Sequence, residues 1–93
     1  MGDNITIKYD STNIKGTINR YFYSGVSGSV TSSVYKCDEN FECKSSIRTV
    51  EPNNWYRTTS NSIVINVIDG SGEIKARIVD KSHNYAEMSK LHV

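Results

Sequence analysis

The sequence lacks long apolar runs and any excess of charge of one sign. No apolar run approaches the ~20 residues that a membrane-spanning helix needs, so no membrane span is expected. Lys and Arg total 11 and Asp and Glu total 10, which gives a net charge of +1. The balance also holds in both halves of the chain. This argues against a dedicated double-stranded DNA binder, which needs several uncompensated phosphate contacts.

Helical periodicity is also missing. No stretch of a dozen residues repeats apolar positions at helical spacing, and there is a single proline. Val, Ile, Thr and Tyr instead alternate with polar residues between Ser-, Asn- and Gly-rich turns, which is typical of short strands. The pattern predicts strands over residues 4–9, 14–23, 29–37, 42–50, 55–59, 62–68 and 73–80.

These strands predict one all-β domain over residues 1–93, built as a small antiparallel β-sandwich or closed barrel of six to eight strands. The segment 62–68 has apolar residues on both alternating sets, so we expect it to be buried on both faces. The glycine loops 24–28 and 69–72 are expected to be hairpin turns. Residues 82–93 fit either a short helix or a last edge strand.

Cysteine is scarce, but its placement is informative. Cys37 and Cys43 bracket the polar turn Asp38-Glu39-Asn40-Phe41 between two predicted strands, so pairing of the strands would bring the two sulfurs together. We therefore predict a disulfide. The loop-entropy estimate for so small a ring is about 2–2.5 kcal/mol, which matters because only 37% of the residues are apolar and the core is thin.

A disulfide indicates an oxidising compartment. The start of the chain, Met1-Gly2-Asp3-Asn4, has neither the basic nor the apolar segment of a signal peptide. Together these features predict a mature secreted or extracellular domain with an added Met1 or Met1-Gly2. Free thiols would instead indicate a cytoplasmic protein.

Residues suited to catalysis or metal binding are few. Only His83 and His92 titrate near neutral pH, and no G-x-S-x-G motif is present, so we expect no enzyme and no cofactor. Cys37, Cys43, His83 and His92 have spacings outside the usual zinc-finger ranges, so no metal site is expected.

The aromatic residues carry the clearest binding signal. Tyr21-Phe22-Tyr23 is a run of three, so at least one ring must face outward from a strand. The only tryptophan, Trp55, and its neighbour Tyr56 follow a proline turn. Exposed rings of this kind suit stacking on sugars or anchoring of a protein partner. Polar groups that would orient such a ligand are supplied by Asn53, Asn54 and Arg57.

The leading hypothesis is therefore a secreted, non-enzymatic module that binds a carbohydrate or a protein surface through Trp55, Tyr56, Tyr21 and Tyr23. In the competing interpretation of the aromatics, Trp55 plugs the core and the outer tyrosines only cover the sheet. Two other functions stay open. One is a small toxin, effector or protease inhibitor acting through the clamped turn Asp38–Phe41. The other is a structural subunit of a surface or phage assembly that pairs through edge strands.

Overall fold

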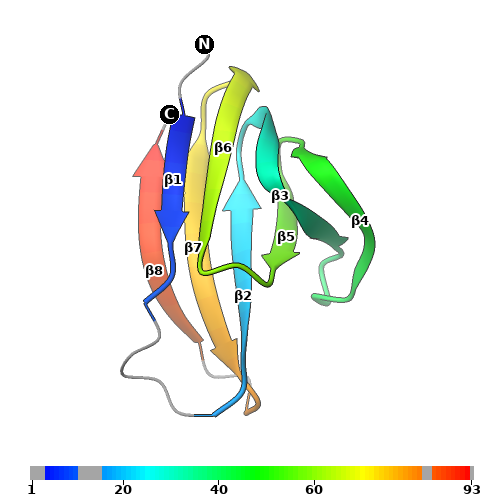
Figure 1. Ribbon diagram of the computed structural model, residues 1–93, viewed down its shortest axis with the longest axis vertical. Helices are drawn as coiled ribbons and strands as arrows, with labels where there is room; N and C mark the ends of the chain where they lie inside the picture. The colour runs from blue at the N-terminus through cyan, green and yellow to red at the C-terminus, as the bar shows by residue number, and fades with distance from the viewer. Residues whose placement is uncertain (1–3, 11–15, 83–84, 93) are drawn as a thin grey trace.

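The chain folds into eight antiparallel strands (Figure 1). The computed structural model describes residues 4–10, 16–82 and 85–92, and for 88–92 it describes the backbone alone. No helix occurs in these residues, so the all-β prediction is confirmed. The strands are β1 (Asn4–Lys8), β2 (Ile18–Ser24), β3 (Ser27–Cys37), β4 (Cys43–Val50), β5 (Asn54–Thr58), β6 (Ser62–Asp69), β7 (Glu73–Asp80) and β8 (Tyr85–His92).

The eight strands form one curled sheet, a half-barrel. Their order is β1-β6-β3-β5-β2-β7-β8, and β4 lies along the other edge of β3. The long strand β3 pairs with β6 through Ser27–Val30 and with β5 through Tyr35–Cys37. Because β3 joins the β1-β6 part of the sheet to the β5-β2-β7-β8 part, the sheet folds over on itself and encloses a core. The architecture therefore lies between the two predicted forms, a sandwich and a closed barrel.

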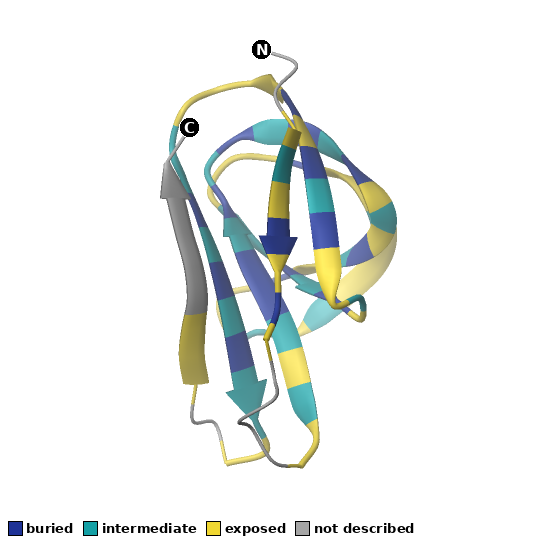
Figure 2. Cartoon of the chain, turned by 60° about the vertical axis from the view of Figure 1, so that its left-hand side comes forward, coloured by how far each residue is buried: buried dark blue, intermediate teal, exposed yellow. Residues whose placement is uncertain are grey.

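Alternation of buried and less buried residues along β3, β5, β6 and β7 builds the core (Figure 2). In β6, Ile63, Ile65 and Val67 point inward and are buried. Asn66 and Ile68 point outward, and Ile68 is 58% exposed. The prediction that this strand is buried on both faces is wrong. It lies beside the edge strand β1, and its outer face is open to solvent, so only the alternate residues are covered.

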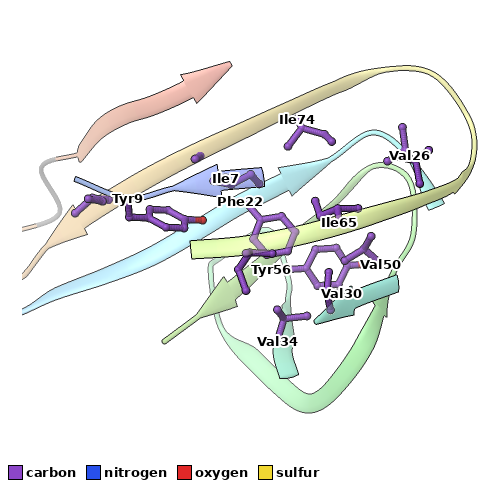
Figure 3. Close-up of a cluster of buried hydrophobic side chains, with 14 residues drawn as sticks. Ile7, Tyr9, Phe22, Val26, Val30, Val34, Val50, Tyr56, Ile65 and Ile74 are labelled. Carbon is purple, nitrogen blue, oxygen red and sulfur yellow. The ribbon is translucent and has the colours of Figure 1, made fainter. Parts of the chain in front are cut away.

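Three aromatic rings lie in the core, with Phe22 and Tyr56 near its centre and Tyr9 toward one end (Figure 3). Phe22 and Tyr56 are fully buried and stacked, with ring centroids 5.4 Å apart. The buried Tyr9 hydroxyl donates a 2.8 Å hydrogen bond to the Tyr21 carbonyl oxygen. The Tyr56 hydroxyl accepts one of 2.8 Å from the Glu51 N–H. Both buried phenols are therefore satisfied by backbone groups, as burial of a polar group requires.

The two glycine loops are arches and not the predicted hairpin turns. The loop after β2 and the loop after β6 each join strands that do not pair with one another. A hairpin is impossible in the second case, because β6 already lies between β1 and β3, and β7 lies between β2 and β8. The arches pack backbone against backbone: the Gly25 N–H donates to the Glu73 carbonyl oxygen at 2.8 Å.

The C-terminal segment Tyr85–His92 is strand β8 and not a helix. It pairs antiparallel with β7, with one register shift beside Ala76 and Arg77. As a helix it would have left the backbone groups of that edge of β7 without strand partners. Of the two predicted alternatives, the edge strand is the one that forms.

A methyl group at Gly25 should destabilise the fold. A Cβ there would lie 2.7 Å from the Glu73 oxygen and 2.8 Å from its nitrogen, and both atoms are backbone. We expect Gly25→Ala to lower the free energy of unfolding by about 1–3 kcal/mol. The measurement is the urea midpoint, with Ser71→Ala at an exposed position of the other arch as the control. Equal midpoints for wild type and Gly25→Ala would show that the arches are not tightly packed.

Alkaline pH should destabilise the protein through its buried phenols. Burial raises the pKa of Tyr9, against the opposing charge of Arg20, and raises the pKa of Tyr56, against the hydrogen bond from Glu51. Below about pH 10 both phenols are protonated in the folded and unfolded chains. Above it the unfolded chain ionises first, so the free energy of unfolding falls as the pH rises, by at most about 1.4 kcal/mol per pH unit for a phenol that keeps its proton in the folded chain.

Urea titrations from about pH 8 to about pH 11 measure this slope. Tyr9→Phe removes one of the two phenols and should therefore give a shallower decline than wild type above about pH 10. An identical slope in the two proteins would mean that Tyr9 does not retain its proton in the fold.

Candidate functional site

The nine aromatic residues divide sharply between the core and one outer face. Tyr9, Phe22 and Tyr56 are buried in the core. The other six lie on the outer side of the β3-β5-β2-β7-β8 part of the sheet or on the turn beside it. Three cationic side chains lie among these rings. We call this set the aromatic face: Tyr21, Tyr23, Tyr35, Phe41, Trp55 and Tyr85, with Arg57, Lys75 and Arg77.

Strand register brings these side chains together. Tyr23 of β2 stands opposite Trp55 of β5 and Lys75 of β7. Two residues earlier in β2, Tyr21 stands opposite Arg57 of β5 and Arg77 of β7. Since alternate residues of a strand share a face, the outward positions of three neighbouring strands form rows of rings and cations.

The rings and cations of the face contact one another. Trp55 packs against Tyr23 and Phe41, with centroids 5.5 and 5.3 Å apart. The Arg77 guanidinium lies 4.9 Å from the Trp55 ring centroid and 4.1 Å from that of Tyr85. At such distances a cation is attracted to the ring by about 0.5–2 kcal/mol. Arg57 makes the same kind of contact with Tyr35 at 4.9 Å.

Arg77 is held in place from several sides. Its Nη2 donates to Glu87 Oε1 at 3.2 Å, which joins β7 to β8. Its Nε is buried and has no hydrogen-bond partner among the described residues. The guanidinium is therefore fixed by the two rings and the carboxylate, and it divides the face into a Trp55 side and a Tyr85 side.

The turn between β3 and β4 is closed by the predicted disulfide, which the structure confirms. Cys37 and Cys43 stand directly opposite each other at the ends of the two strands. Asp38 fixes the turn further: its Oδ1 accepts hydrogen bonds from the N–H groups of Asn40 at 2.8 Å and Glu42 at 3.0 Å. The turn is thus ordered by one covalent bond and by side-chain capping.

Phe41 is the residue of this turn whose ring lies on the aromatic face. Its backbone has φ of +59°, a conformation that a bulky side chain rarely adopts. Its ring lies 5.0 Å from that of Tyr21, edge to face, and 5.3 Å from that of Trp55. The aromatic site and the clamped loop, which the sequence presented as rival contact regions, are therefore one continuous surface.

The structure brings together most of the predicted site residues. Trp55, Tyr23 and Arg57 are half-buried on the aromatic face, so Trp55 does not plug the core. Tyr21 lies on the same face but is only 6% exposed, and Phe41 packs against it. Tyr56 points to the opposite side and is fully buried, so it is left out of the site.

The predicted polar residues lie at the rim. Asn53 Oδ1 accepts a 2.8 Å hydrogen bond from the Tyr23 hydroxyl and so holds that ring. The Asn54 amide is turned back into its own loop, where it donates to the Pro52 carbonyl oxygen at 3.0 Å. Glu39 and Asn40 are exposed on the clamped turn.

The predicted binding site left out four members of the face: Tyr35, Tyr85, Lys75 and Arg77. The outward alternation of Lys75 and Arg77 along residues 73–80 is visible in the sequence. Which strands flank them is not, because that depends on long-range pairing. Tyr85 was hidden by the ambiguity between helix and strand.

Among the described residues, no group of three His, Cys, Asp or Glu side chains lies close enough together to hold a metal ion. His83 and the side chain of His92 lie outside the described part of the chain. Nor does the part of the chain that the structure describes contain a helix with the length and apolar character to cross a bilayer.

Loss of the disulfide should loosen the turn and alter the environment of Trp55. In the double variant Cys37→Ser, Cys43→Ser, we expect the free energy of unfolding to fall by about 2–2.5 kcal/mol, because the unfolded chain regains loop entropy. We also expect a shift in Trp55 emission as Phe41 leaves the indole. Urea unfolding and the native emission spectrum measure the two effects.

Phe41→Ala, with the disulfide intact, is the matched control for the emission shift. A double serine variant with the wild-type midpoint and wild-type emission would show that the bond does not hold Phe41 on the face.

Comparisons with known proteins give no indication of function. No protein-family model matches the chain, and no curated protein or solved structure matches it either.

Proposed function

We propose that this chain is a secreted, non-enzymatic binding module that recognises a carbohydrate through the aromatic face. The observation that carries the proposal is the gathering of six of the nine aromatic residues, with three cations, on one side of the sheet. The disulfide supports secretion, since such bonds persist mainly in oxidising compartments.

The chemistry of the face suits a sugar. Aromatic rings offer flat apolar area against which the C–H face of a sugar ring packs, and they lose little conformational entropy on binding. Trp55 and Tyr23 form such a pair on two adjacent strands and are partly exposed. The arginine, lysine and asparagine groups around them supply the few oriented polar contacts that give a site its specificity.

The charge of the face favours a neutral ligand over a polyanion. Lys75 is paired with Glu73 at 3.4 Å, and Arg77 with Glu87 at 3.2 Å. Arg57 is the only cation of the face that makes no ion pair with a described residue. Single-stranded nucleic acid needs a strongly positive groove beside its stacking rings. Cations that already have carboxylate partners do not provide one.

A protein ligand is the second candidate, and the clamped turn favours it. The disulfide and the Asp38 hydrogen bonds order this turn before any partner arrives, which lowers the entropy cost of docking. Glu39 and Asn40 are exposed at its tip. Such a turn is what a toxin, effector or protease inhibitor would present.

Assembly through edge strands has less support. The outer edge of β4 borders no other described strand, but the strand carries a register shift near Ser45, whose φ is +59°. Lys44 and Arg48 are exposed on it. Bulges and charges are the features by which edge strands avoid pairing with other chains.

The test is a glycan array followed by fluorescence titration of the best ligands. Trp55 is the only tryptophan, so its emission reports from the face itself. We expect Tyr23→Ala and Trp55→Ala each to weaken binding at least about tenfold, or ~1.4 kcal/mol, because both rings would contact the sugar. Since Trp55→Ala removes the probe, calorimetry measures that variant.

Ile68→Ala is the matched control, because Ile68 is 58% exposed on the outer face of β6 and lies outside the aromatic face. It should leave affinity unchanged. An array without any bound glycan would overturn the proposal. A protein ligand lost on substitution of Glu39 and Asn40, but kept in Tyr23→Ala, would favour the second candidate.

A further inference from the structure

A pocket opens in the Tyr85 side of the aromatic face. It has a volume of about 440 Å³, within the range of ligand-binding sites. It lies between the clamped turn, which contributes Asn40 and Phe41, and the strands β2, β7 and β8. Of its lining residues, Tyr21, Asn40 and Phe41 were suggested for binding by the sequence, and those of β7 and β8 were not part of the predicted site.

Aromatic side chains form its apolar walls. Tyr21 and Phe41 pack edge to face on one side, and Tyr85 stands on the other. Tyr85 is 60% exposed, so its ring is accessible to a ligand. The Arg77 guanidinium, 4.1 Å from the ring centroid, holds Tyr85 in place. A flat ligand with an apolar face fits against such walls.

Two side-chain amides of the pocket have no hydrogen-bond partner among the described residues. Neither the Asn19 nor the Asn40 side-chain amide forms a hydrogen bond with any described residue, although both residues line the pocket. An amide offers two donors and an acceptor with two lone pairs. Sugar hydroxyls likewise both donate and accept, so two free amides match a sugar better than they match a carboxylate or phosphate, which only accepts.

Among the described residues at the pocket, positive and negative charges are equal in number. Arg77 and Lys81 are matched by Asp80, which lines the pocket, and by Glu87, which is paired with Arg77. An anionic ligand would lie near the Asp80 carboxylate as well as near the Lys81 ammonium. The balance therefore favours a neutral ligand in this pocket.

We infer that this pocket is a subsite for one neutral sugar residue, with its ring against Tyr85 and Phe41 and its hydroxyls on Asn19 and Asn40. The inference rests on the proposed function and locates the most enclosed part of that site. Phe41 also touches Trp55, so a longer glycan continues from the pocket across Phe41 toward Trp55 and Tyr23.

The experiment compares monosaccharides with their oligomers. The probes are D-glucose, D-galactose, D-mannose and N-acetyl-D-glucosamine, short oligomers of each, and D-glucuronic acid as the acidic probe. Affinity is read from NMR chemical-shift titrations and from Trp55 emission. The wild-type chain should bind at least one neutral monosaccharide, and shifts should appear at Asn19, Asn40 and Tyr85.

Two pocket variants test the amides. In the double variant Asn19→Ala, Asn40→Ala, affinity for the monosaccharide and for its oligomers should fall at least about tenfold. Asn19→Asp keeps the size of the side chain but replaces its two donors with a charge, and it should weaken binding as well. Both asparagines are exposed, so the thermal midpoint should stay close to wild type, which checks folding.

Tyr23→Ala separates the pocket from the rest of the face. It should weaken oligomer binding by a larger factor than monosaccharide binding, because its ring lies outside the pocket. Ile68→Ala is the control that should change neither.

The outcomes distinguish the two proposals. Glycan binding that is insensitive to the Asn19 and Asn40 variants would overturn the subsite and leave the proposed function standing. Binding of D-glucuronic acid without binding of any neutral sugar would likewise overturn the subsite and leave the proposed function standing. Failure of the wild-type chain to bind any glycan would overturn both.

Discussion

Strand β3 is hydrogen-bonded along one edge to two different strands, and the rest of the structure depends on this change of partner along β3. Its first residues pair with β6 and its last residues with β5. The pairing with β4 on the other edge is irregular between Ser29 and Val34, where β3 passes from one partner to the next. The sheet must curl at this point, so the inward residues of β6 come to face those of β2 and β5. The core of Phe22, Tyr56 and Ile65 is the result.

The same strand positions the candidate site. Because the second half of β3 lies beside β5, Cys37 stands opposite Trp55 as well as opposite Cys43. The disulfide therefore lies next to the Trp55 indole. The turn that it closes is short, and the Phe41 ring of this turn packs against the same indole. A local crosslink of this kind adds little to the definition of the fold. Its main effect is to order one edge of the aromatic face.

The sequence predicts what is local and misses what depends on long-range pairing. Alternation gave seven of the eight strands within a few residues, and the spacing of Cys37 and Cys43 gave the disulfide. The glycines of the arches looked like hairpin turns because a turn sequence does not reveal whether its flanking strands are already paired on both edges. Residues 62–68 looked doubly buried because Ile68 is apolar, yet no layer covers it. Tyr56 and Trp55 are adjacent in the chain and point to opposite sides, so only the register decides which ring meets solvent.

The opposite outer face of the sheet shows why the aromatic face needs an explanation beyond sheet coverage. On the β1-β6 side, outward positions hold the small polar residues Thr6, Asn66 and Ser29 and the aliphatic residues Val64 and Ile68, and none of these five is aromatic. That side is as regular as the other, so large rings are not required to form or cover this sheet. Formation of the sheet alone therefore does not account for their gathering on the β3-β5-β2-β7-β8 part of the sheet. The face also carries a local cost, since Phe41 adopts a left-handed backbone and Arg77 buries an Nε without a partner among the described residues. Arg20 buries its Nε in the same way outside the face, so the conformation of Phe41 and the gathering of the rings support the proposed binding role more than the unsatisfied donor does.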